Sequence, residues 1–165
     1  MDRLIAQDAI MKRVYQWADA EDALDRESIV SLFMPEQKLT LDMSSLLGVP
    51  SMEITPVQFW EQIYNSLAGF TATQHLMTNP LFTFDEENPL KMRVVVNVLA
   101  YHCIEADGKL ESVTSRGKEE IDFEMHSGKW MIRAIIIKPT APGDNPQLYQ
   151  VASERVHKGD VRKGK

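Results

Sequence analysis

Residues 90–138 decide the fold and read LKMRVVVNVLAYHCIEADGKLESVTSRGKEEIDFEMHSGKWMIRAIIIK. Apolar runs of strand composition alternate there with Asp-Gly at 107–108 and Ser-Gly at 127–128, pairs that favour the tight turns of β-hairpins. A fourth run precedes them across the turn-forming segment DEENP at 85–89. The predicted strands cover residues 71–84, 90–105, 110–125 and 130–138. Three consecutive hairpins predict one curled antiparallel sheet rather than a parallel α/β sheet.

The first third of the chain predicts helices. An apolar stripe with helical spacing runs through residues 4–18, and Asp25 is placed to cap a short second helix. Thr55-Pro56 begins another helix that ends at Gly69. A short strand at about residues 38–43 precedes that helix. The fold class is therefore α+β, with the helices packed on the concave face of one bent sheet.

Composition excludes several classes of function. The chain has 165 residues and a net charge of −6, which disfavours binding to a phosphate backbone as the main activity. Its longest aliphatic run, residues 134–137, is too short for a membrane span, and its one cysteine, Cys103, fits a reducing compartment. We expect one cytoplasmic domain over residues 1–140, with neither a nucleic-acid nor a membrane partner. Residues 141–165 would follow it as a C-terminal segment, with a helix that could form a lid and a disordered basic tail.

Two histidines stand in otherwise apolar strands. Alternation places His75 on one face of its strand with Thr73, Met77 and Asn79. It places His102 on one face of the next strand, behind a row of small and aliphatic residues. Each could be a structural histidine, but two in adjacent strands favour an acid–base site because unpaired buried imidazoles are costly. Asp22, between two predicted helices, could orient an imidazole.

The third long strand carries a charged row that allows two interpretations. Lys118 and Glu120 share one face with other charged residues, whereas Glu119 shares the opposite face with Ile121 and Phe123. Either the charged row faces solvent, or it points into a pocket and the apolar row meets another subunit. The sequence has no nucleotide-binding, P-loop, zinc-protease or serine-hydrolase motif, and its four histidines show no metal-ligand spacing. We therefore expect no cofactor and no metal.

The element order and several short motifs resemble scytalone dehydratase and the SnoaL-like proteins of the NTF2-like superfamily. The motifs are Trp17-Ala18-Asp19-x-x-Asp22, Leu41-Asp42, Thr73-Gln74-His75, His102 and Ile137-Lys138-Pro139. The resemblance covers about residues 8 to 140 and implies a cone-shaped α+β barrel around one pocket. It also implies a homo-oligomer, a trimer or a dimer, and a C-terminal segment that closes over the pocket mouth.

Carried over residue by residue, the resemblance makes Asp22, His75 and His102 the catalytic group. Asp22 would hold His102, while His75 acts as acid and base in the loss of water β to a carbonyl. The two tyrosines of the dehydratase fall at Glu21 and Met43 here, and its serine and asparagine fall near Lys118 and Glu120. The candidate substrate-binding residues are Glu21, Met43, Trp60, Met77, Asn79, Lys118 and Glu120.

These residues predict a cofactor-independent dehydratase, a lyase of secondary metabolism, with a small oxygenated cyclic metabolite as its substrate. The alternatives are an isomerase or cyclase of the SnoaL-like type, and a binding domain of the same fold without catalysis. In the binding domain, Asp22 and His102 would lie out of hydrogen-bond reach, or Met43, Met77 and Trp60 would fill the cavity.

Overall fold

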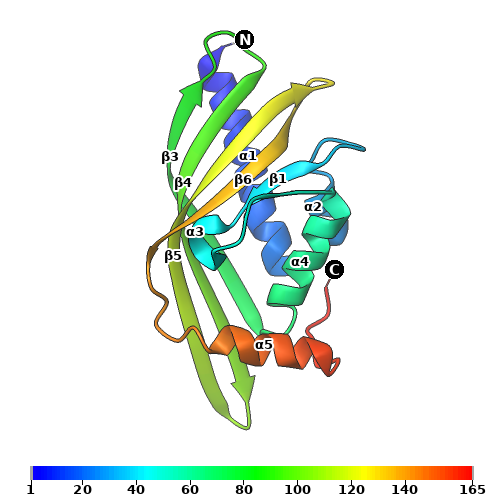
Figure 1. The fold of residues 1–165 in the computed structure, drawn as a ribbon, viewed down its shortest axis with the longest axis vertical. Coiled ribbons are helices and arrows are strands. Elements are labelled where there is room, and N and C mark those ends of the chain that lie inside the picture. Colours follow the sequence, from blue (N-terminus) through cyan, green and yellow to red (C-terminus); the bar gives the residue numbers. More distant parts are fainter. Residues whose placement is uncertain (1, 165) are drawn as a thin grey trace.

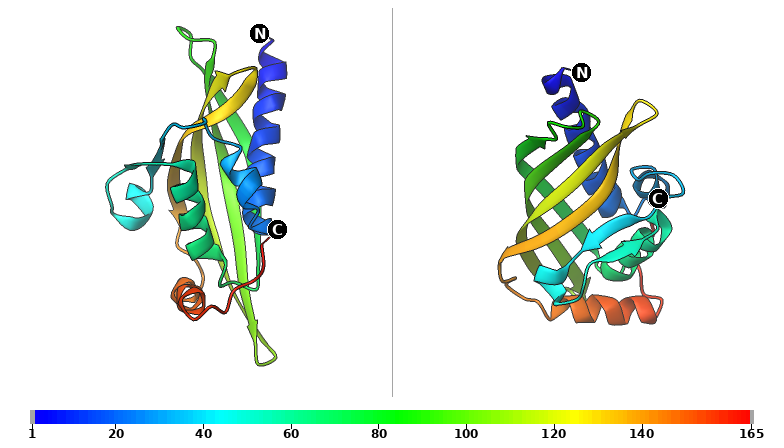
Figure 2. Two further views of the ribbon diagram at one scale, coloured as in Figure 1. Left: turned by 90° about the vertical axis from the view of Figure 1, so that its right-hand side faces the viewer. Right: turned by 45° about the horizontal axis from the view of Figure 1, so that its top comes forward.

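The computed structural model describes residues 2–164. Its helices are α1 (Arg3–Ala23), α2 (Arg26–Val30), α3 (Ser44–Leu47), α4 (Pro56–Leu67) and α5 (Leu148–His157). Its strands are β1 (Leu39–Asp42), β2 (Met52–Ile54), β3 (Ala72–Phe84), β4 (Lys91–Ala106), β5 (Lys109–His126) and β6 (Lys129–Ala141). The strands form one sheet in the order β2-β1-β6-β5-β4-β3, which is curved and open (Figure 1). The helices α1, α2 and α4 lie on its concave side, and α5 crosses one end of the molecule (Figure 2).

The predicted hairpins and helix starts are confirmed. Asp107 and Gly108 both have positive φ, as do Ser127 and Gly128, which is the geometry of a type I′ turn. At the start of α4, Thr55 accepts a hydrogen bond from the backbone of Gln58, whose side chain accepts one from Thr55 N–H in return. Local chemistry therefore sets both the strand register and the beginning of this helix.

One sheet contact differs from the antiparallel prediction. The short strand β1 pairs in parallel with β6, with Thr40 opposite Ala134, and an isolated parallel bridge joins Phe33 to Ile132. The other strand pairs of the described sheet are antiparallel. More than ninety residues separate these partners along the chain, so no turn chemistry can signal the pairing. The short strand β2 and the single-turn helix α3 are likewise additions to the predicted elements.

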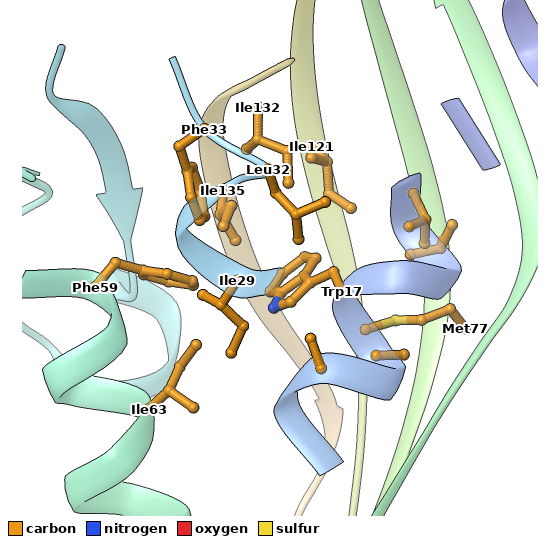
Figure 3. Close-up of a cluster of buried hydrophobic side chains, with 14 of the residues drawn as sticks. Trp17, Ile29, Leu32, Phe33, Phe59, Ile63, Met77, Ile121, Ile132 and Ile135 are labelled. Atoms are coloured by element: carbon orange, nitrogen blue, oxygen red, sulfur yellow. The ribbon is translucent and has the colours of Figure 1, made fainter. Parts of the chain in front are cut away.

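The core lies between the concave face and the helices. Trp17 of α1 packs at its centre among apolar side chains of α2, α4, β3, β5 and β6 (Figure 3). Ile121 and Phe123 of β5 point into this core and are almost fully buried. The interpretation in which these two residues meet another subunit is therefore wrong. The charged row lies on the outer face, where Glu120 contacts Arg93 and Lys138 and Lys118 is exposed.

Within residues 2–164, no helix combines the length and the hydrophobicity that a bilayer span requires.

Candidate active site

Three elements bring the candidate catalytic residues together. Asp22 lies in the last turn of α1, which ends at Ala23 because Leu24 adopts a left-handed conformation as the C-cap. His75 and His102 lie on the concave face of β3 and β4, where His75 pairs with Ala100 and Thr73 pairs with His102. This two-residue offset makes the imidazoles diagonal neighbours, and their Nε2 atoms are 3.4 Å apart.

Asp22 holds His75. Its Oδ1 lies 2.8 Å from His75 Nδ1 and accepts a 2.8 Å hydrogen bond from the hydroxyl of Thr73, while its Oδ2 accepts a 2.9 Å bond from the backbone N–H of His75. The expectation that Asp22 holds His102 is thus wrong. The cause is topological, because α1 packs on the edge strand β3 and its last turn reaches His75 before β4.

His102 contacts Tyr149, a residue that the family resemblance did not place in the site. Its Nδ1 lies 2.9 Å from the hydroxyl of Tyr149 on α5, which lies 2.8 Å from the Ser115 hydroxyl on β5. The rings of Phe70 and Tyr149 pack against His102. The predicted C-terminal helix is α5, which lies within residues 141–165, but nothing in the sequence indicates which of its side chains reaches the sheet.

The pKa values of His75 and His102 are shifted in opposite directions. Burial alone would lower the pKa of His75, but the charge of Glu21, the hydrogen bond and charge of Asp22 and the charge of Glu119 raise it to about 9. Burial and the neighbouring His75 charge lower the pKa of His102 to about 3. For Asp22, burial would raise the pKa, but its bonds to His75 and Thr73 and the charge of His75 lower it. At neutral pH, His75 is therefore an imidazolium beside a carboxylate, and His102 is neutral.

The charge states fix the direction of the hydrogen bonds. A charged His75 carries a proton on both nitrogens, so Nδ1–H donates to Asp22 and Nε2–H points at the Nε2 of His102. His102 then carries its own proton on Nδ1 and donates to the Tyr149 oxygen. The hydroxyl of Tyr149 donates in turn to Ser115. One connected network thus runs from α1 across the sheet to α5.

Two further carboxyl groups are buried near His75. Glu21 Oε2 lies 3.9 Å from His75 Nε2, and burial raises the pKa of Glu21. Glu119 faces inward on β5; its Oε2 is buried without a hydrogen-bond partner, and burial followed by the charge of Glu21 raises its pKa to about 8. Glu119 was not among the predicted site residues. Its signal was its position as the lone acid in the row with Ile121 and Phe123.

The other predicted substrate-binding residues lie apart from this network. Met77 is buried on the same face as His75, and Met43 and Trp60 are half-buried against the core. Asn79 is exposed, because a bulge between Thr78 and Leu81 breaks the alternation that was expected to turn it inward. Lys118 and Glu120 lie on the convex face, so their assignment to a pocket is wrong.

The C-terminal segment also differs from the expected disordered tail. Val161 packs against the core, and the guanidinium of Arg162 donates a 2.8 Å hydrogen bond from Nη2 to the Thr73 hydroxyl. Residues 2–164 contain no group of three or more His, Cys, Asp or Glu side chains arranged to hold a metal ion.

Comparison with known families and structures identifies the family and the fold of this chain. Residues 2–135 match the model of the SnoaL-like domain. The chain belongs to the SnoaL-like family. The predicted fold class is thereby confirmed, as a curved, open sheet with N-terminal helices. A comparison with curated proteins finds no match.

Several solved structures are similar in fold to this SnoaL-like protein. Kfla4162 of Kribbella flavida is 18% identical with a TM-score of 0.77, over 92% of this chain and 99% of that one. A Novosphingobium aromaticivorans protein provisionally named a scytalone dehydratase is 18% identical with a TM-score of 0.66, over 84% and 86%. The hexachlorocyclohexane dehydrochlorinase LinA-type3 of Novosphingobium barchaimii is 14% identical with a TM-score of 0.64, over 85% and 90%. At these identities the likeness shows the fold.

Proposed function

We propose that this SnoaL-like protein is a lyase that removes water from a small oxygenated cyclic compound, using its own side chains for both proton transfers. The observation that carries the proposal is the 2.8 Å contact between Asp22 Oδ1 and His75 Nδ1. It leaves His75 Nε2, which points at His102, as the nitrogen whose proton a substrate would take in place of His102. That nitrogen lies 3.9 Å from the Glu21 carboxylate. An imidazolium and the side chain of a buried glutamate, an acid and a candidate base, thus lie side by side on the concave face.

The roles follow from the charges. His75, held as an imidazolium, donates its Nε2 proton to the hydroxyl that leaves as water. Glu21, whose pKa burial raises, takes in its ionised form the proton from the carbon next to the carbonyl. The C–H electron pair forms the new double bond as the C–O bond breaks. Afterwards Glu21 carries a proton and His75 is neutral, so one proton transfer between them restores the starting state.

The short distance between acid and base suits a syn elimination, in which both groups leave from one face of the ring. Two similar structures carry the names of elimination enzymes, a dehydratase and a dehydrochlorinase. These names support elimination as the reaction class. The contact between Asp22 and His75, which together form the Asp22–His75 dyad, supports the assignment of the proton transfer to these residues.

The proximity of Glu21 to His75 also supports one alternative function, that of an isomerase. If Glu21 returned its proton to a different carbon, the double bond would move and no water would be lost. Product analysis separates the two, because a dehydration lowers the product mass by one water and an isomerisation leaves the mass unchanged.

The test is turnover of a panel of cyclic β-hydroxy ketones, followed by the absorbance of the conjugated enone and by mass. His75→Gln and Asp22→Asn should each lower kcat/KM by about 100-fold or more. The matched control is His126→Gln at the exposed end of β5, which should keep the wild-type value. Full activity in His75→Gln would overturn the proposal.

A further inference from the structure

The last residues of the chain turn back from α5 toward the site. Arg155 donates a 2.8 Å hydrogen bond from Nε to Asp160, and the backbone N–H of Asp160 donates to the Arg155 carbonyl at 2.9 Å. Beyond this turn, Val161 packs against the core. The chain therefore leaves α5 in a fixed direction, between the ends of α1 and α4.

Two backbone contacts fasten this segment. The N–H of Arg162 donates to the carbonyl of Ala68, the C-cap of α4, at 3.0 Å. Gly164 lies directly against the carbonyl of Leu24, where an added Cβ would come within 2.5 Å of the oxygen. Leu24 is the C-cap of α1, two residues after Asp22. The segment is thus in contact with the turn that carries the catalytic carboxylate.

The side chain of Arg162 completes a hydrogen-bond chain to that carboxylate. Its Nη2–H donates to Thr73 Oγ1 at 2.8 Å, and the Thr73 hydroxyl donates to Asp22 Oδ1 at 2.8 Å. A hydroxyl has one proton, so the acceptance from Arg162 directs the Thr73 proton toward Asp22. Asp22 Oδ1 is the same oxygen that contacts His75 Nδ1. The guanidinium of Arg162 therefore helps to hold Asp22 in place against His75, through the hydroxyl of Thr73.

We propose that Arg162 is a positioning residue for the Asp22–His75 dyad and acts through Thr73. The proposal rests on the proposed function, in which this dyad performs the proton transfer. It assigns a role in the site to a residue beyond the part that matches the SnoaL-like family model.

The experiment compares full-length variants. Arg162→Met removes the donor, Arg162→Lys keeps the charge, and Lys163→Met removes a charge from the adjacent exposed position as the matched control. We expect Arg162→Met to lower kcat about ten-fold with little change in KM, the size of one charge-assisted hydrogen bond. Arg162→Lys should restore part of the loss, and Lys163→Met should match wild type.

Thr73→Val tests the route. If Arg162 acts through the Thr73 hydroxyl, Arg162→Met should cause no further loss of kcat in the Thr73→Val background. Additive losses would show that Arg162 acts by another route and would overturn the proposal. A rise in kcat in Arg162→Met would show that the segment blocks the site, and would overturn it too.

A spectroscopic readout separates this proposal from the proposed function. The His75 Nδ1 proton is hydrogen-bonded to Asp22. Proton NMR on protein isotopically labelled at histidine measures the rate at which this proton exchanges with water. We expect faster exchange in Arg162→Met and the wild-type rate in Lys163→Met. This result requires no turnover, so it stands if the dehydration itself is disproved. An unchanged exchange rate in Arg162→Met would overturn the positioning role.

Discussion

Replacing the buried acid Glu119 with glutamine should stabilise the protein and flatten the pH dependence of its unfolding. Glu119 is 8% exposed, and its Oε2 has no hydrogen-bond partner. Burial raises its pKa from 4.5 to about 8, so the folded protein holds a proton that the unfolded chain releases. A glutamine of nearly the same shape stays neutral at every pH.

The magnitude follows from proton linkage. A group whose pKa is higher in the folded state contributes stability below its unfolded pKa and loses it as the pH rises toward the folded pKa. Each pH unit in that window is worth about 1.4 kcal/mol. Between pH 5 and pH 7.5, wild type should lose about 3 kcal/mol that Glu119→Gln does not lose.

The assay is urea unfolding of both proteins at several values between pH 5 and pH 7.5. His75 also loses stability with rising pH, through its raised pKa of about 9, and the charge of Glu119 contributes to that raised pKa. Well below pH 8, Glu119 is neutral in wild type as glutamine is in the variant, so the His75 contribution is the same in both proteins at the lower pH values of the series. The free-energy difference between variant and wild type should grow steadily with pH. A difference that stays constant would refute the buried, proton-holding state of Glu119.

Two further predictions concern His75 and Tyr149. If His75 acts as an acid, kcat/KM should fall as the pH rises through about 9, because the imidazolium loses its proton there; a pH–rate profile that rises through this range would assign His75 the role of base instead. Tyr149→Phe removes the hydroxyl that contacts both His102 and Ser115, and should lower the free energy of unfolding by about 1–3 kcal/mol. Urea unfolding measures this loss, and unchanged stability would contradict the contacts of α5.

Much of the fold could be predicted because its signals are local. The Asp-Gly and Ser-Gly turns set the β4–β5 and β5–β6 hairpins, and the Thr55 cap sets the start of α4. The parallel pairing of β1 with β6 could not be predicted, since it depends on the folding of everything between them.

The sequence predicted which residues are candidates for the site, but it did not predict which of them contact one another. Strand alternation identified His75 and His102, and the helix boundary identified Asp22, but which histidine Asp22 reaches depends on how α1 packs on the sheet. Alternation failed at Asn79 because a bulge interrupts it. Arg162 lies in a tail whose composition is typical of disorder, and its packing depends on contacts with distant residues, among them Arg162 with Thr73 and Gly164 with Leu24.

The central claim is that the carboxylates around His75 hold it as an imidazolium acid. The most direct measurement is the titration of the His75 ring by NMR in wild type and in Asp22→Asn. The structure predicts a pKa of about 9 in wild type and a lower value in Asp22→Asn, because the variant loses the charge and weakens the hydrogen bond at Nδ1. A wild-type pKa near 6.5 that Asp22→Asn leaves unchanged would contradict the claim.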